Sequence, residues 1–306
     1  MSSLAFEHSG SSHVRLWGIA CAIVGTAFFA TLDTTSQLVG MAAPVLMVQW
    51  IRYSMQTLAT SAMILPTRGL GGLRTHSLGL QLLRCLLMMA STGMAFISLR
   101  YVPVGDFTAI VMLIPLLVTL ISMVVLKEKV SALRWALVLG SFVGTLIIVH
   151  PGQAGFQMVW LLPLLVAVAG TAFQVLTARM MRTEDGTTTH WYSGLFGMLI
   201  TTCALPFVWQ SLPPRIWALL LLIALASTAG HMLLIMAYQR AGAVLTTAYQ
   251  YCQIGFAMLG GWVVFGRVPD AWALVGIGMI VLCGVLGAWL TLREGRASTA
   301  PQVLDT

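Results

Sequence analysis

Apolar runs of about 20 residues, separated by short polar or proline- and glycine-rich stretches, follow one another along almost the whole chain. A bilayer core about 30 Å thick is crossed by a helix of about 20 apolar residues, because each helical residue adds about 1.5 Å. The fold predicted from these runs is an all-α membrane protein with ten transmembrane helices. The ten segments span residues 16–40, 45–66, 78–100, 105–126, 131–150, 157–180, 190–210, 215–238, 244–265 and 271–292.

The composition supports lipid, and not water, as the medium around these helices. Hydrophobic residues make up 58% of the 306 residues and charged residues only 8%, against roughly 25% charged in soluble domains. The net charge of +7 comes from basic residues that lie between the apolar runs. A nucleic-acid-binding surface needs basic residues clustered on one face and interleaved with aromatic residues. The expected partner is therefore the lipid bilayer, and no nucleic acid is expected.

Residue patterns for catalysis, metal binding and processing are not found in the sequence. The chain contains no HExxH, GxSxG or Walker A motif, so an enzyme or an ATP-driven pump is not indicated. No cofactor and no metal are expected, because the five cysteines are isolated within apolar runs. Residues 1–14 are polar and precede an apolar run without a clear small-residue cleavage site, so we expect no cleaved signal peptide.

The lysines and arginines at the ends of the segments predict the orientation of the chain in the membrane. Positive residues are retained on the cytoplasmic side during insertion. With a cytoplasmic N-terminus, three arginines fall on the outer side: Arg100, Arg215 and Arg267. Eleven basic residues then fall on the inner side: Arg15, Arg68, Arg74, Lys127, Lys129, Arg134, Arg179, Arg182, Arg240, Arg293 and Arg296. We therefore expect an inner-membrane protein whose two termini are both cytoplasmic.

A weak internal repeat relates the two halves of the chain. Residues 99–109 resemble residues 238–248 at an offset of 139, and at this offset residues 127–129 fall on residues 266–268. Five segments per copy is an odd number, so the second copy would enter the membrane in the opposite orientation. Two inverted five-helix repeats are a common plan of secondary transporters.

These features resemble the drug/metabolite transporter superfamily, in its EamA-type branch of ten-helix transporters. The residues that carry the resemblance are Asp33, the run 50–53 (Trp-Ile-Arg-Tyr) and the stretch 109–128 with Pro115. The sequence departs from the family pattern at Arg267, where an acidic residue often follows the glycine. The resemblance implies a cytoplasmic tail (1–15), a first repeat (16–150), a second repeat (157–292) and a cytoplasmic tail (293–306). It also implies a central cavity between the first, third, fourth, sixth, eighth and ninth helices, with the fifth and tenth more peripheral.

Small residues four positions apart occur in the two helices that the resemblance places at the periphery. Gly140 and Gly144 lie in the fifth segment, and Gly284 and Ala288 lie in the tenth. Such spacings allow two helices to approach closely. The close packing is expected either within one protomer or in a homodimer.

Asp33 and Arg52 are predicted to face each other at the same depth of the membrane. Each lies about seven residues from the outer end of its helix, and a four-residue turn joins the two helices. An ionisable group in hydrocarbon costs several kcal/mol, so each such residue has either a structural partner or a function. The pair is either a structural ion pair or one that forms and breaks during transport.

Other polar and aromatic residues within the segments complete a predicted substrate cavity. Gln49, Arg52 and Gln56 form a polar stripe that faces either the cavity or neighbouring helices. His231 is either a packing residue or a proton carrier. Arg84 is expected to extend towards the lipid headgroups. The predicted cavity residues are Asp33, Gln37, Gln49, Arg52, Tyr53, Phe96, Met112, Gln174, His231, Tyr249, Gln253 and Phe256.

These residues predict a secondary transporter of a small-molecule substrate that is neutral, zwitterionic or aromatic, such as an amino acid. A strongly anionic substrate would be met by several lysines or arginines at mid-depth, and only Arg52 and Arg84 lie within the segments away from their ends. The expected mechanism is alternating access, driven by a proton on Asp33 or His231, by exchange, or by the substrate gradient alone. The alternative is a membrane accessory or scaffold subunit that transports nothing.

Overall fold

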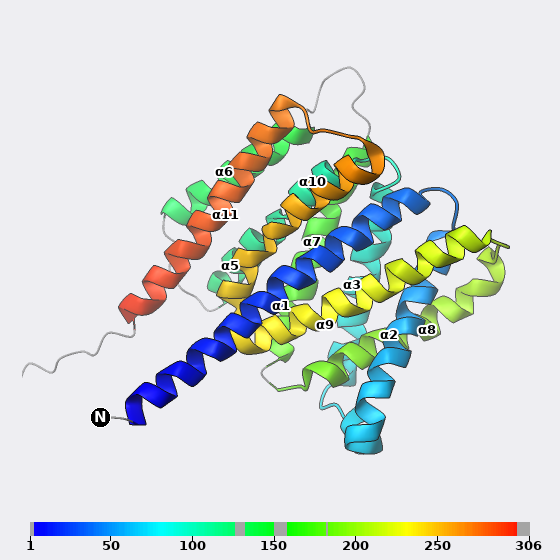
Figure 1. Cartoon of the computed structure of the whole chain (residues 1–306), viewed down its shortest axis with the longest axis horizontal. Helices are drawn as coiled ribbons and strands as arrows, with labels where there is room; N and C mark the ends of the chain where they lie inside the picture. The colour runs from blue at the N-terminus through cyan, green and yellow to red at the C-terminus, as the bar shows by residue number, and fades with distance from the viewer. Residues whose placement is uncertain (1–2, 126–131, 150–157, 182, 299–306) are drawn as a thin grey trace, which may run out of the picture.

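The computed structural model describes residues 3–125, 132–149, 158–181 and 183–298, and every regular element within these ranges is a helix (Figure 1). The predicted all-α class is therefore confirmed. The elements are α1 (Ser3–Val39), α2 (Val45–Arg68), η1 (Gly69–Leu73), α3 (Leu78–Ser98), α4 (Val104–Val111), α5 (Leu113–Val125), α6 (Ala132–Val149), η2 (Met158–Leu161), α7 (Leu162–Met180), α8 (Gly186–Val208), α9 (Pro214–Gln250), α10 (Cys252–Phe265) and α11 (Ala271–Ser298).

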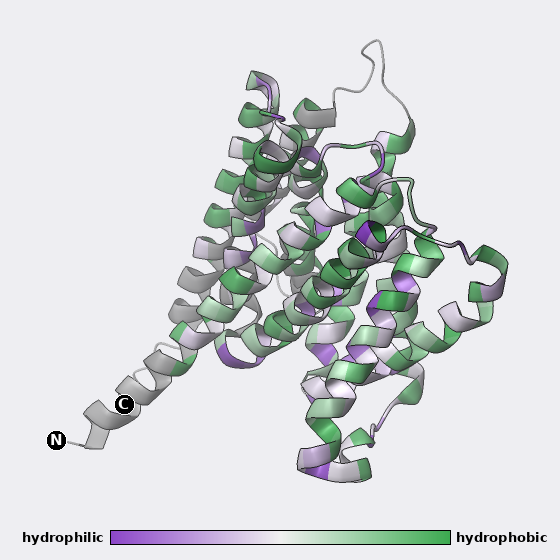
Figure 2. Ribbon diagram, turned by 45° about the vertical axis from the view of Figure 1, so that its right-hand side comes forward, coloured by the Kyte–Doolittle hydropathy of each residue, from purple (hydrophilic) through white to green (hydrophobic). Residues whose placement is uncertain are grey.

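Five helical stretches in the described part of the chain are long and apolar enough to cross a bilayer. They are Leu16–Val39, Leu78–Ser98, Met158–Met180, Gly186–Val208 and Pro214–Ala241. Shorter apolar helical stretches are Val104–Val118, Trp135–Gly144, Cys252–Phe265 and Ala271–Gly287. Apolar residues dominate the helices (Figure 2), and many large apolar side chains are exposed. An apolar outer surface of this kind is suited to contact with lipid. The number of ten membrane spans and their arrangement as an inverted repeat remain predictions.

Several helix boundaries differ from those predicted: α1 already begins at Ser3 and α11 extends to Ser298, and two differences lie within the bundle. The fourth segment is divided at Met112, between α4 and α5, where Pro115 provides no backbone N–H for the carbonyl of Val111. The eighth helix does not end near residue 238 but continues as α9 to Gln250, and the next break is at Tyr251. Arg240 and Gly242 interrupt the apolar run without interrupting the helix, because neither removes a backbone donor as proline does. Met112 and Tyr251 lie 139 positions apart, which is the offset of the sequence repeat.

The helices pack in pairs that join the two halves of the sequence. α1 lies along α9 and α10, α2 along α8, and α3 along α7, while α6 and α11 form a pair at one edge of the bundle (Figure 1). A Cβ added to Gly144 would come within 2.8 Å of the Gly276 carbonyl oxygen. One added to Gly140 would come within 2.9 Å of Cys283 Sγ. The glycines of α6 therefore allow close packing against α11 within the protomer, and a homodimer remains a prediction.

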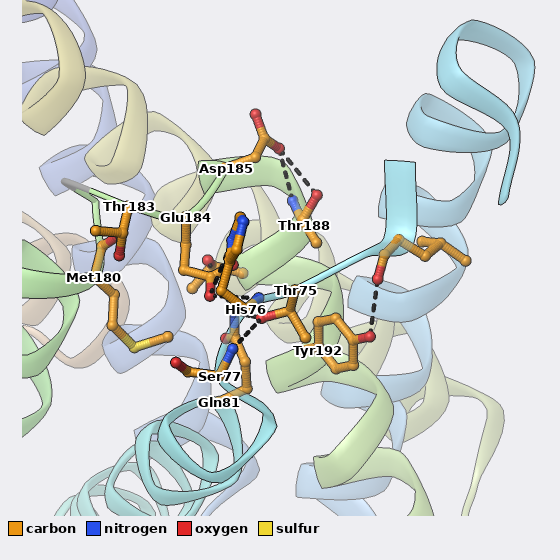
Figure 3. A network of polar contacts seen from close by, with 12 residues as sticks. Thr75, His76, Ser77, Gln81, Met180, Thr183, Glu184, Asp185, Thr188 and Tyr192 are labelled. Atoms are coloured by element: carbon orange, nitrogen blue, oxygen red, sulfur yellow. Dashed lines mark hydrogen bonds and ion pairs between the residues drawn. The ribbon is translucent and has the colours of Figure 1, made fainter. Parts of the chain in front are cut away.

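One end of the bundle is closed by what we call the polar junction, formed by residues 68–77 and 183–192 (Figure 3). Glu184 Oε1 accepts a hydrogen bond from the His76 backbone N–H at 2.9 Å and lies 3.9 Å from His76 Nδ1. Thr188 Oγ1 donates to the Gly72 carbonyl at 2.6 Å, and Tyr192 Oη donates to the Leu73 carbonyl at 2.8 Å. The connection after α2 is thus held to the start of α8 by polar contacts.

Asp185 both caps α8 and forms an ion pair across the polar junction. Its Oδ1 accepts a hydrogen bond from the Thr188 backbone N–H at 2.9 Å, and its Oδ2 lies 2.9 Å from Arg68 Nη1. Partial burial raises the pKa of Asp185, but the bonds from Thr188 and the Arg68 guanidinium outweigh this effect. The pKa of the carboxyl therefore lies below its ordinary value, and the ionised form stabilises the junction.

The opposite ends of α2 and α8 meet at what we call the aromatic junction, formed by residues 43–50 and 209–217. The Trp209 ring lies 6.5 Å from the Trp50 ring and 5.9 Å from the Trp217 ring, measured between centroids. Apolar residues of α1, α2 and α9 form a continuous cluster against which Trp50 and Trp217 pack, and this cluster includes the fully buried Leu220. This junction therefore depends on apolar packing.

Candidate substrate cavity

A cavity of about 130 Å³ lies at the centre of the bundle, between α1, α3, α4, α5, α7, α9 and α10. Five of the predicted cavity residues line it: Asp33, Met112, Gln174, His231 and Gln253. The other polar residues of its wall are Ser91, Thr92 and Gln250, and its aromatic residues are Phe29, Phe107 and Phe173. The cavity is thus mostly apolar, with a small number of polar groups at defined positions, as is typical of small-molecule sites.

Asp33 and Gln253 form one polar group of the wall. Gln253 Nε2 donates a hydrogen bond to Asp33 Oδ2 at 3.1 Å, which joins α1 to α10. No lysine or arginine is found among the described residues that line the cavity. The carboxylate therefore faces the cavity with an amide as its partner and without a cation in contact.

His231 lies between aromatic rings on the α9 side of the cavity. Its ring centroid is 4.9 Å from that of Phe29 and 6.2 Å from that of Phe173. Its Nδ1 lies 2.9 Å from the Ser227 carbonyl oxygen, so this nitrogen carries the proton of the neutral ring. The ring of His190 stacks on the other side at 6.2 Å. The imidazole is consequently held in a fixed orientation at the cavity wall.

The predicted pairing of Asp33 with Arg52 is wrong for this structure. Within the described ranges, the ion pairs with N···O distances of 4.0 Å or less are Arg68–Asp185 and His76–Glu184. Arg52 instead donates to Ser227 Oγ on α9, at 2.8 Å from Nη2, and to Gln49 Oε1 at 2.8 Å. Counting residues from the helix ends placed the two residues at the same depth of the membrane, but the side chain of Arg52 is directed to α9.

The polar stripe of α2 packs against helices and does not line the cavity. Gln49 Nε2 donates to Thr92 Oγ1 at 2.7 Å, and Gln56 Nε2 donates to the His190 carbonyl at 2.7 Å. Tyr53 is fully buried, with its hydroxyl 3.3 Å from Thr92 Oγ1. Of the two interpretations of this stripe, the structure therefore favours helix packing through side-chain hydrogen bonds.

Four other predicted cavity residues also lie outside the central cavity. Gln37 connects α1 to the start of α4 by donating to the Val102 carbonyl at 3.0 Å, and it lines a separate pocket of about 280 Å³ near Arg267. Phe96, Tyr249 and Phe256 pack in apolar clusters around the cavity. Periodicity predicts the side of a helix on which a residue lies, but it does not show which neighbouring helix covers that side.

Arg84 was expected to extend towards the headgroups, and the structure contradicts this expectation. The residue is 1% exposed, and its guanidinium lies 4.6 Å from the centre of the Phe173 ring. It donates to Thr177 Oγ1 at 2.8 Å and also to Ser193 Oγ. Because α7 and α8 both cover this part of α3, the side chain has polar partners within the protein and no route to the lipid.

Gln250 was missed by the sequence analysis, although it lines the cavity and is 4% exposed. It lies three residues before Gln253 and therefore on nearly the same helical face, which was the signal available in the sequence. Tyr238 was noted as sharing a face with His231, and its hydroxyl donates to Gln174 Oε1 at 2.9 Å. The wall of the cavity thus contains three glutamines from α7, α9 and α10.

An apolar helical bundle around a cavity with few polar groups is the architecture of a membrane transport protein. Residues 16–150 match the EamA-like transporter family of the drug/metabolite transporter superfamily. The resemblance drawn from Asp33, residues 50–53 and residues 109–128 is confirmed. This family match indicates a transporter rather than an enzyme.

Several curated proteins and a solved structure are similar to this chain. A riboflavin transporter of Rhizobium johnstonii is 28% identical over 283 residues, covering 92% of each chain. A riboflavin transporter of Vibrio cholerae serotype O1 is 28% identical over 230 residues, covering 73% of this chain and 76% of its own. The pseudopaline exporter CntI of Pseudomonas aeruginosa is 29% identical over 198 residues, covering 61% of this chain and 66% of its own.

The similarity to a solved structure concerns the fold alone. That crystal structure shares 17% sequence identity with this chain and superposes with a TM-score of 0.63. It covers 94% of this chain and 99% of the solved chain. The arrangement of helices is therefore shared over nearly the whole length.

Proposed function

We propose that this protein is a secondary transporter that moves a small neutral, zwitterionic or aromatic metabolite through the central cavity. The observation that carries the proposal is the wall of this cavity, in which Asp33 and three glutamines are set among aromatic rings. Two relatives carry the name riboflavin transporter and one the name pseudopaline exporter. A flavin or another ring compound is therefore the first substrate to test.

The charges near the cavity support this substrate class over a strongly anionic one. Arg52 and Arg84 are buried, and the hydrogen bonds of their guanidinium groups go to neutral oxygens of Gln49, Ser227, Thr177 and Ser193. Neither is among the residues that line the central cavity. A substrate in this cavity meets amides, rings and one carboxylate, and this set suits neutral or zwitterionic molecules.

Alternating access is the mechanism that we propose. The cavity of about 130 Å³ is smaller than the roughly 300–1,000 Å³ of most ligand pockets. The helices must therefore separate to admit a metabolite, first towards one side of the membrane and then towards the other. The helix breaks at Met112 and Tyr251, which border this region, are suitable places for bending. Asp33 and His231 are the candidate proton carriers on the wall.

In the proposed topology, both termini lie in the cytoplasm and the polar junction faces the cytoplasm. The excess of arginine and lysine on that side supports this orientation. Cysteine labelling from one side of the inner membrane checks it. Reaction of single cysteines placed in residues 151–156 and in residues 182–189 from the same side would contradict both the topology and the inverted repeat.

The transport proposal is tested by uptake and counterflow in proteoliposomes. Labelled riboflavin, amino acids, nucleosides and purines are offered with and without a pH gradient, to the wild type and to Asp33→Asn. Asp270→Asn is the matched control, because asparagine also caps a helix and Asp270 caps α11 outside the central cavity. We expect saturable uptake that is lost or becomes independent of pH in Asp33→Asn and that is unchanged in Asp270→Asn. If folded wild-type protein moves none of these compounds, the accessory or scaffold alternative is favoured.

A further inference from the structure

A single hydroxyl, that of Tyr238, joins two glutamine side chains on the wall of the central cavity. Tyr238 Oη donates to Gln174 Oε1 at 2.9 Å, and the side chain of Gln250 hydrogen-bonds the same hydroxyl. Gln174 comes from α7, whereas Tyr238 and Gln250 come from α9. Both glutamines line the cavity, and Tyr238 lines a small extension of it beside Arg84.

The two hydrogen bonds of the Tyr238 hydroxyl determine which polar atoms of Gln174 and Gln250 remain available to a ligand. A tyrosine hydroxyl has one proton, so when it donates to one amide it must accept from the other. Gln174 receives the proton at Oε1 and retains the N–H groups of Nε2, while Gln250 donates from Nε2 and retains the carbonyl oxygen Oε1. If the donor and acceptor in both of these hydrogen bonds were exchanged, the two glutamines would exchange roles. The cavity would still meet one donor and one acceptor.

The acceptor has no partner within the described protein. Gln250 Oε1 is buried and makes no hydrogen bond, and the residue is only 4% exposed. Buried polar atoms are nearly always hydrogen-bonded, because an unpaired one loses its bond to water without replacement. Gln250 Oε1 is therefore a buried, unpaired acceptor beside the cavity, and a ligand admitted when the helices separate would supply its donor.

We propose that Gln174 and Gln250 together recognise a lactam or imide edge, which is an N–H group beside a C=O group, on a planar ring. The N–H of the ring donates to Gln250 Oε1, and its C=O accepts from Gln174 Nε2. Both amides bond the same oxygen, which keeps their remaining groups close together, as adjacent N–H and C=O groups require. Phe29, Phe107 and Phe173 line the same cavity and offer apolar surface to the ring. This assignment rests on the proposed transport function and narrows its substrate class.

Matched pairs of ring compounds test the assignment by binding. The full-length protein in detergent micelles is titrated with riboflavin and 3-methylriboflavin, and with hypoxanthine and 1-methylhypoxanthine. Each second compound replaces the ring N–H by N–CH₃. The wild type is expected to bind one or both N–H compounds about 10-fold or more tightly than the methylated partners. Equal affinity within the pairs, or no binding of either N–H compound, would overturn the proposal.

Variants of Gln174 and Gln250 then test whether these two residues cause the preference for the N–H compounds over their methylated partners. Gln250→Leu is expected to weaken binding of the N–H compound about 10-fold and to leave the methylated partner nearly unchanged, so that the preference disappears. Gln174→Leu is expected to weaken both compounds, because the ring C=O is present in each. Gln210→Leu, in the exposed connection after α8, is the matched control and should bind as the wild type does. A preference that persists in Gln250→Leu would contradict the assignment.

The outcome of the binding experiment can be distinguished from the outcome of the transport experiment. The comparison of ligand pairs uses only wild-type protein, so it remains decisive if a variant does not fold. A preference for the N–H compounds without uptake in proteoliposomes would contradict the transport mechanism and support the recognition. Uptake of another compound without any such preference would contradict the recognition alone.

Discussion

The polar junction and the aromatic junction are held together by different kinds of contact. At the polar junction, residues 68–77 meet residues 183–192 through hydrogen bonds and the Arg68–Asp185 ion pair. At the aromatic junction, residues 43–50 meet residues 209–217 through tryptophan rings and an apolar cluster. Both regions join the first half of the chain to the second, at opposite ends of α2 and α8 (Figure 1). The polar junction should respond to pH and salt, and the aromatic junction should respond mainly to changes in packing. The two junctions can thus be altered independently of each other.

The largest expected effect is a loss of packing below the aromatic junction. Leu220→Ala removes a fully buried side chain and leaves a space that its neighbours fill only in part. We expect the free energy of unfolding in mixed detergent micelles to fall by about 3 kcal/mol. Leu221→Ala is the control, because Leu221 is 48% exposed on the same helix, and its effect should be much smaller. Similar losses for both variants would mean that the cluster is not the basis of this junction.

Removal of one hydroxyl from the polar junction should have a smaller effect. Tyr192→Phe removes the hydrogen bond to the Leu73 carbonyl and leaves the ring in place. We expect the free energy of unfolding to fall by about 1 kcal/mol. Tyr101→Phe, at an exposed tyrosine, is the control and should change little. If Tyr192→Phe is as stable as the wild type, the hydrogen bonds of this junction contribute less than the comparison requires.

Acid should weaken the polar junction and leave the aromatic junction unchanged. The pKa of Asp185 is lowered in the folded protein, so its contribution is complete above the unfolded value of about 4 and is lost as the pH falls through the lowered value. Since Asp185 is partly exposed, we expect a loss of less than about 1 kcal/mol. Unfolding is measured from pH 7 to pH 3 in the wild type and in Asp185→Asn. The difference between the two proteins should shrink towards the acid end, and a constant difference would contradict the role of the charge.

The smallest expected effect is that of the ion pair alone. Arg68→Gln should lower the free energy of unfolding by about 0.2–1 kcal/mol, because both side chains are partly exposed to solvent. The same measurement in about 1 M salt should remove most of the difference, since the screening length falls to about 3 Å. Arg74→Gln is the control for a nearby arginine outside this ion pair. An effect of Arg68→Gln that does not depend on salt would assign the role of Arg68 to packing.

Much of the fold was predictable because hydrophobic runs and helix breakers are local properties of the sequence. The helical class and most segment boundaries follow from them, and so does the membership of Asp33, Gln174, His231 and Gln253 in the cavity wall. The end of the eighth helix was not predictable, because Arg240 and Gly242 interrupt hydrophobicity without breaking the hydrogen-bond pattern of the helix.

The sequence by itself determined that this chain is a helical membrane protein with few charges, and it identified the ionisable residues that need partners. Only the tertiary structure decided which partners these are. Arg52 bonds to Ser227 rather than to Asp33, Arg84 is enclosed by α7 and α8, and Tyr238 connects Gln174 to Gln250. The physical reason is that periodicity fixes the face of a helix on which a residue lies, whereas hydrogen bonds depend on distances of about 3 Å between atoms of different helices. Those distances are set by the packing of the whole bundle.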